Sequence, residues 1–148
     1  MRQTLKRGLA RVLQDGTDAV ATGNDDDLHA LRIEAKRLRY NLEFAAPVLG
    51  DAAHEPLALL VLAQDRLGAL ADADTFARTY AVMLADLPAT SELRPGLERL
   101  CNDAARERVR ALEAVRALWN DPERNAYLAK LAASISAAVG SLSNEGPS

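Results

Sequence analysis

The chain has 148 residues, of which 49% are hydrophobic but only 4% aromatic, so its core must be built from Leu, Ala and Val. That composition is typical of packed helices and argues against a β-sandwich. Because the net charge is −3, a polyanion would have to be held by a local cluster of cations and not by the charge of the whole molecule. The length suffices for one core, and we expect residues 1–148 to form a single helical domain.

Residues 2–21 are predicted to form the first helix, although Gly16 and Thr17 weaken its middle. Its apolar edge consists of Leu5, Leu9, Val12 and Val20. Gly23 and Asn24 end this helix, and residues 25–27, all aspartates, open the next one. One of these aspartates can cap the new helix, and all three suit the positive end of its dipole.

The second helix, at about residues 26–49, has the clearest pattern in the chain. Its apolar residues are spaced three and four apart, as in the a/d seam of a heptad repeat: Leu28, Leu31, Ala35, Leu38, Leu42, Ala45 and Leu49. One position further along runs a basic stripe of His29, Arg32, Lys36 and Arg39, which Glu43 closes. A third, partly aromatic stripe follows: Ile33, Arg37, Tyr40 and Phe44.

The position of the basic stripe is unusual, because a surface helix ordinarily carries its charges opposite its core face. Here the stripe lies between two faces that can pack against neighbours, and Glu34, Asn41 and Val48 are left for the most exposed side. Like charges three and four residues apart repel one another. Either an anion from outside or the chain's own carboxylates must compensate them, and the pattern alone favours neither.

Further helices are predicted at 56–72, 73–87, 96–119 and 122–139, so the fold class is an all-α, antiparallel bundle of about five to six helices. Pro56 starts the third helix, Asp72 caps the fourth, and Asp121 with Pro122 caps the last. Residues 141–148 are expected to be a frayed tail.

Two segments resemble the CHAD family, the conserved histidine α-helical domains. The first is the basic helix, in which His29-Ala30-Leu31-Arg32-Ile33 is followed by Lys36-Arg37-Leu38-Arg39-Tyr40 and by Glu43-Phe44. The second is Gln64-Asp65-Arg66-Leu67-Gly68-Ala69-Leu70-Ala71-Asp72, which follows after one loop, as in the family. The family's domain has two similar halves with one basic helix each, and this chain resembles the second half only.

The resemblance implies binding of inorganic polyphosphate or another condensed phosphate, without catalysis. The implied contacts are His29, Arg32, Lys36 and Arg39, flanked by Arg37 and Tyr40. The implied supporting residues, which would hold the arginines in position, are Gln64, Asp65 and Asp72. Because one half supplies few charges, we expect a homodimer whose two copies share a basic groove, or a second half-domain on another chain, or a fragment of a longer protein.

Other chemistries find little support in the sequence. Two carboxylate-x-x-His pairs, which end in His29 and His54, begin at helix ends, so no metal site is expected. We see no cofactor motif or signal peptide and no apolar run near the ~20 residues of a membrane span, so we expect a cytoplasmic protein, found at polyphosphate granules if the resemblance holds. With one aromatic residue beside the stripe, nucleic acid is a weak option.

A helical interaction module is the alternative function, in which the same stripe binds an acidic or phosphorylated protein partner. Competition distinguishes the two hypotheses, since long polyphosphate should displace such a partner and short phosphates should not. An enzyme is the least expected reading, because the serines and Cys101 have no histidine near them in sequence.

Overall fold

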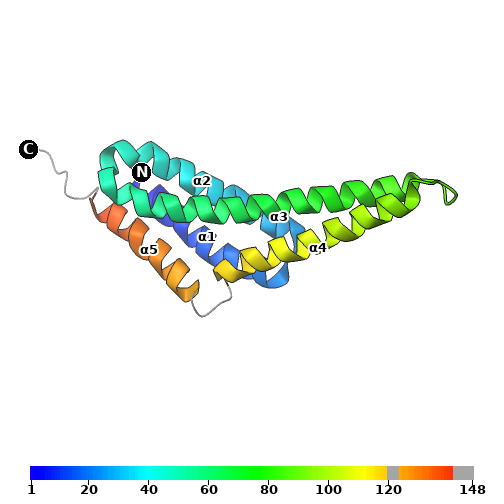
Figure 1. The fold of residues 1–148 in the computed structure, drawn as a ribbon. Coiled ribbons are helices and arrows are strands. Elements are labelled where there is room, and N and C mark those ends of the chain that lie inside the picture. The colour runs from blue at the N-terminus through cyan, green and yellow to red at the C-terminus, as the bar shows by residue number, and fades with distance from the viewer. Residues whose placement is uncertain (120–123, 142–148) are drawn as a thin grey trace, which may run out of the picture.

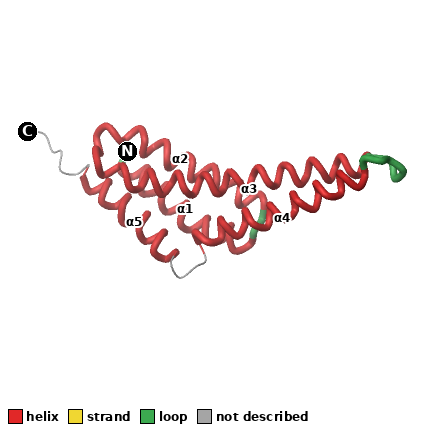
Figure 2. The backbone as a smooth tube through the Cα atoms, viewed as in Figure 1, coloured by secondary structure: helices red, strands yellow, loops and turns green. Residues whose placement is uncertain are grey.

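A computed structural model describes residues 1–119 and 124–141 of the chain (Figures 1 and 2). In the described part, α1 (Arg2–Thr22), α2 (Asp25–Leu49), a short 3-10 helix η1 (Gly50–Ala53), α3 (His54–Asp86), α4 (Arg94–Trp119) and α5 (Arg124–Ser141) follow in that order, without a strand. The predicted all-α bundle is confirmed. The predicted cap at Asp121 and Pro122, and the predicted tail beyond Ser141, lie outside the described residues.

The heptad seam of α2 is the centre of the fold. The buried residues of α2 are the seven that the spacing predicts, and α1 packs along them. The helix is capped by Asn24, whose side-chain oxygen accepts hydrogen bonds from the backbone N–H groups of Asp26, at 2.9 Å, and Asp27, at 3.3 Å. The prediction that an aspartate caps this helix is therefore wrong, and all three aspartates lie in its first turn.

The two outer flanks of α2 are the reverse of those predicted, except at Val48, which is exposed as expected. Glu34 and Asn41, expected on the most exposed side, are partly buried, and Glu34 lies 3.6 Å from Arg11 of α1. The aromatic stripe, expected to pack, faces solvent, with Tyr40 50% and Phe44 78% exposed. The cause is the position of α1, which covers the Glu34 flank.

Helix α3 is continuous over 33 residues, so the predicted break at residues 72–73 is wrong. Asp72 is an exposed residue within the helix and caps nothing. The hydroxyls of Thr75 and Thr79 donate to the carbonyls of Ala71 and Thr75, one turn back, so they share acceptors with the backbone hydrogen bonds of the helix without interrupting it. The continuous helix carries residues 73–86 in register with the second motif.

The outer half of α3 and the first half of α4 extend together beyond the other helices (Figure 1). We call residues 73–110 the arm. Its α3 and α4 segments lie side by side and are joined by the loop that follows Asp86 (Figure 2). The arm has few buried apolar residues, namely two alanines and one leucine: Ala73, Leu97 and Ala104.

One stretch within residues 25–86 is notably apolar. An 18-residue window within Asp25–Asp86 has a mean hydropathy of 1.3, which by length and composition alone is enough to span a membrane. By that criterion the prediction that no run approaches a membrane span is wrong. Core helices of soluble proteins and signal sequences meet the same criterion, and 28% of this window is buried inside the fold.

Candidate polyanion-binding site

Burial of the seam sets the direction of the basic stripe. With the a/d residues of α2 turned inward, His29, Arg32 and Lys36 lie on its solvent-exposed side. Within the described part of the chain, none of these three side chains has a carboxylate partner. The positive charges of Arg32 and Lys36 therefore remain available to an anion from outside.

The C-terminal end of the stripe, at Arg39, is compensated by side chains of the protein itself. We call the other three residues, His29, Arg32 and Lys36, the upper stripe. Arg39 is partly buried. Its Nε donates to Glu43 Oε1 at 2.7 Å, and its Nη1 donates to Gln64 Oε1 at 2.6 Å. Arg37 donates to Glu34 at 2.8 Å. Internal compensation, one of the two possibilities left open by the sequence, therefore holds for Arg37 and Arg39 and not for His29, Arg32 and Lys36 in the described part of the chain.

Tyr40 lies between two of these cations. Lys36 Nζ is 5.5 Å and Arg39 Cζ 5.7 Å from the centre of its ring, within the range of cation–π attraction. Because Tyr40 is half exposed, this attraction orients Lys36 along the surface and leaves the remaining sides of its ammonium group accessible.

The three predicted supporting residues differ in what they do. Gln64 holds Arg39 through the 2.6 Å hydrogen bond, as expected of a positioning residue. Asp65 and Asp72 are exposed, and among the described contacts neither forms an ion pair with Arg32 or Arg39. The structure thus supports the positioning hypothesis for Gln64 and gives Asp65 no part in it.

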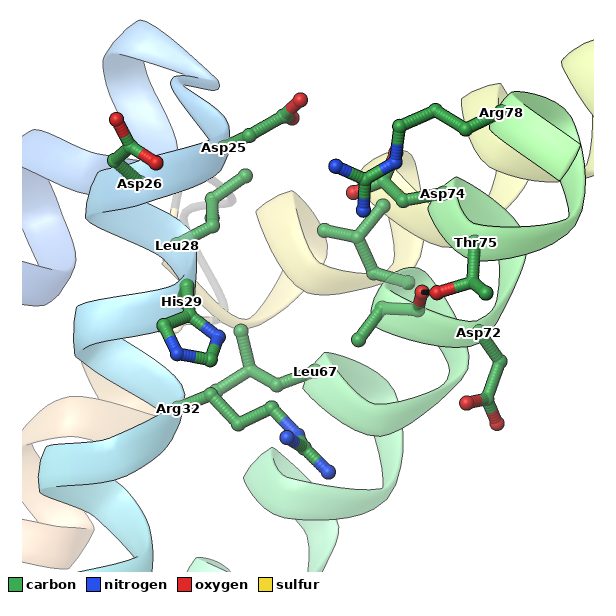
Figure 3. A pocket seen from close by; sticks show the side chains of 12 residues that line it. Asp25, Asp26, Leu28, His29, Arg32, Leu67, Asp72, Asp74, Thr75 and Arg78 are labelled. Carbon is green, nitrogen blue, oxygen red and sulfur yellow. Dashed lines mark hydrogen bonds between the residues drawn. The ribbon is translucent and has the colours of Figure 1, made fainter. Parts of the chain in front are cut away.

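A cavity of about 420 Å³ opens at the upper end of the stripe, between α2 and α3 (Figure 3). His29 and Arg32 line it from α2, and Asp72, Asp74, Thr75 and Arg78 line it from α3. Figure 3 shows Arg32 extending from α2 toward α3. The cavity also contains the carboxylates of Asp25 and Asp26, so its lining is mixed in charge.

Two of the four carboxylates in the cavity wall are paired with Arg108 of α4. Arg108 donates to Asp25 at 2.9 Å and also to Asp74. The hydrogen bond to Asp74, together with the negative charges of Asp74 and Asp25, raises the pKa of Arg108 above its usual value despite partial burial. Arg108 thus joins three helices and offsets one of the two negative charges that would otherwise attract Arg32 or repel a phosphate.

Arg78 is the site residue that sequence reasoning missed. It lies one turn beyond Asp74 on α3, exposed, and without a carboxylate partner in the described part of the chain. The assumed break at Asp72 placed it on a separate helix. The available signal was spacing: residues 67, 71, 74 and 78 follow the three-and-four rule along one face of a continuous helix.

Other chemistry has no assembled site in the part of the chain that the structure describes. No group of three or more His, Cys, Asp or Glu side chains is placed to hold a metal ion there. His54 and Asp51 are 3.8 Å apart and both are exposed to solvent.

Comparisons with known proteins place the chain in a family. No curated protein and no solved structure matches the chain. The family model described as "CHAD domain" matches residues 1–81, which include α1, α2, η1 and most of α3. The matched segment covers more than half of the 148 residues and contains both motifs quoted above. The chain therefore belongs to the CHAD family.

Proposed function

We propose that this protein binds inorganic polyphosphate, or a similar condensed phosphate, through the upper stripe of α2 and the adjoining cavity, and that it does so without catalysis. The observation that carries the proposal is the row of His29, Arg32 and Lys36, aligned on one exposed helix face with no carboxylate partner in the described part of the chain. Membership of the CHAD family supports the choice of ligand.

The chemistry of these side chains suits a chain of phosphates. Arg32 offers a planar fork for two phosphate oxygens, Lys36 a compact charge, and His29 a ring N–H donor. Their Cβ atoms lie about 5–6 Å apart in succession, so a linear anion can contact all three at once, while a single phosphate cannot. Long condensed phosphates should therefore bind far better than orthophosphate.

We further propose that the protein acts as a homodimer or beside a second half-domain, since one stripe presents few charges. Two copies holding one long phosphate chain would gain affinity through effective concentration, without any new contact. A cytoplasmic protein located at polyphosphate granules would fit this activity.

The test is a calorimetric titration of the purified chain with long-chain polyphosphate at several salt concentrations. We expect binding whose logarithm falls linearly with the logarithm of salt, at about −0.7 to −0.9 per phosphate neutralised, hence a slope of about −2 to −4 for three or four cations. Orthophosphate at the same phosphate concentration serves as the control. Absence of binding at low salt, or equal affinity for orthophosphate, would contradict the proposal.

Arg78 gives a prediction specific to the cavity. Arg78→Gln should weaken polyphosphate binding roughly tenfold, because one charge-assisted contact is lost while the exposed side chain leaves no buried group unpaired. Arg2→Gln, at an exposed arginine of α1 outside the arm, is the matched control and should leave the affinity unchanged. Equal affinities of the two variants would remove Arg78 from the site.

A further inference from the structure

The arm carries apolar side chains that the bundle does not cover. Phe76 of α3 is 55% exposed and Leu100 of α4 is 46% exposed. The rings of Phe76 and Tyr80 stack at 6.1 Å between centroids, so the aromatic surface is continuous along α3. An aromatic and aliphatic surface of this kind on two helices favours a helical partner.

These side chains form a groove of about 740 Å³ between the two helices of the arm. Its floor contains Phe76 and Tyr80 of α3 with Leu100 and Ala104 of α4. One rim is formed by four charged residues of α4, namely Asp103, Arg106, Glu107 and Arg110. Asp103, Arg106 and Arg110 are spaced three and four residues apart, as are Asp103, Glu107 and Arg110, so the four side chains form a band about 100° wide along the helix.

The order of charge along this rim is negative, positive, negative, positive. A second copy of α4 laid antiparallel, with a twofold axis between positions 106 and 107, brings Asp103 opposite Arg110 and Arg106 opposite Glu107. A parallel copy would place like charges opposite one another. The rim is thus complementary to itself in one orientation, whereas a partner of a single charge sign would meet as many repulsions as attractions.

We propose that the arm groove is a homodimer interface, in which a second copy of this chain packs its arm antiparallel against the first. The apolar side chains of the floor would be buried between the two copies. The charged rim would fix the register in which the two α4 helices align. Within one chain, Arg106 bonds to Asp103, and Arg110 lies 3.6 Å from Glu107. All four side chains are exposed, so each can also meet its counterpart across the axis.

This interface would leave the polyanion site open. On α3 the groove residues Phe76 and Tyr80 lie on roughly the opposite side of the helix from Asp74 and Arg78, which line the cavity, because successive residues turn by about 100°. The two basic stripes would then hold one long phosphate chain as separate sites, not as walls of one shared groove. The interface itself does not depend on the proposed ligand.

The experiment is a charge swap measured by sedimentation equilibrium of the full chain without phosphate. We expect the wild type to reach twice the mass of the 15.9 kDa chain as concentration rises. Asp103→Arg should weaken dimerisation at least roughly tenfold, since it places two arginines opposite each other at two symmetry-related points. The double variant Asp103→Arg/Arg110→Asp should restore it, because the swapped charges again face opposites.

The readout separates the interface from effects within one chain. In the double variant the arginine introduced at position 103 can pair with Glu107, and the aspartate introduced at position 110 can pair with Arg106, each one turn away on the same helix. Restored helicity would therefore report pairing within one chain, whereas a restored dimer mass reports the contact with the second copy. Phe76→Asp should also give monomers, with helicity by circular dichroism as the folding check.

Three outcomes would overturn the proposal. The first is a wild type that stays monomeric as its concentration rises. The second is a dimer that Phe44→Asp of α2 dissociates and Asp103→Arg does not. The third is a double variant that dimerises as weakly as the single one.

Discussion

Arg32→Glu combined with Lys36→Glu should reduce the affinity for long-chain polyphosphate by about 10²- to 10⁴-fold. Each charge-assisted contact contributes about 1.5–3 kcal/mol, and each 1.4 kcal/mol is a factor of ten. Both side chains are exposed and lack a carboxylate partner in the described part of the chain, so their reversal strands no internal group. Affinity measured by titration and helicity measured by circular dichroism give the two readouts.

Arg39 is deliberately left intact in this variant. Arg39→Glu would place a carboxylate beside Glu43 and remove the guanidinium that now donates to Gln64 at 2.6 Å. A loss of binding could then arise from a disturbed helix surface. Among the described interactions, Lys36 contacts only the aromatic ring of Tyr40, so combining its substitution with that of Arg32 disturbs fewer internal contacts than substituting Arg39 would.

Arg2→Glu with Lys6→Glu is the matched control. It removes one arginine and one lysine from exposed positions on α1, outside the arm, and changes the net charge by the same amount. Its affinity should stay near that of the wild type. If both double variants lose binding equally, the whole-molecule charge governs the interaction; if Arg32→Glu/Lys36→Glu still binds at low salt, the stripe is not the site.

The core of α2 could be predicted from the sequence because a heptad seam is a local property. Spacing alone determines which seven side chains share one face of α2. That apolar face is buried whichever helices pack against it. The direction of the basic stripe follows from the same rotation. For this reason His29, Arg32 and Lys36 were identified without any knowledge of the neighbouring helices.

The flanks of α2 could not be predicted in the same way. Which flank is covered depends on the side on which α1 lies, and no residue of α2 encodes that choice by spacing. Glu34 is partly buried because α1 covers it, and Phe44 is exposed because nothing in the described part of the chain covers it. The internal partner of Arg37 follows from this arrangement, since Glu34 is held beside it.

The cavity was missed for a different reason. A possible N-cap at Asp72 was given more weight than the good helix formers around it, and α3 was divided in two. Arg78 then lost its register with Leu67 and Asp74. The contribution of Arg108 depends on contacts with residues 34 and 83 positions away, which no local pattern contains.

Gly16→Val should lower the free energy of unfolding by about 2–3 kcal/mol, a large part of the roughly 5–15 kcal/mol usual for a domain. A Cβ atom at position 16 would lie 2.5 Å from Nε1 of Trp119 and 3.2 Å from Cδ1 of Leu31. Trp119 is fully buried and cannot move aside cheaply. The glycine that weakens α1 as a helix is thus required where α1, α2 and α4 meet. Urea unfolding followed by fluorescence of Trp119, the chain's single tryptophan, measures the loss.

Gly68→Val is the matched control for this effect, because no atom lies within 4 Å of a Cβ at position 68. Its free energy of unfolding should stay within about 0.5 kcal/mol of the wild type. Equal losses in the two variants would trace the effect to valine in a helix and not to the contact with Trp119. Since Leu31 precedes Arg32, a shift of α2 in Gly16→Val should also weaken polyphosphate binding, which Gly68→Val should leave intact. Unchanged binding in a clearly destabilised Gly16→Val protein would mean that the stripe keeps its geometry without this contact.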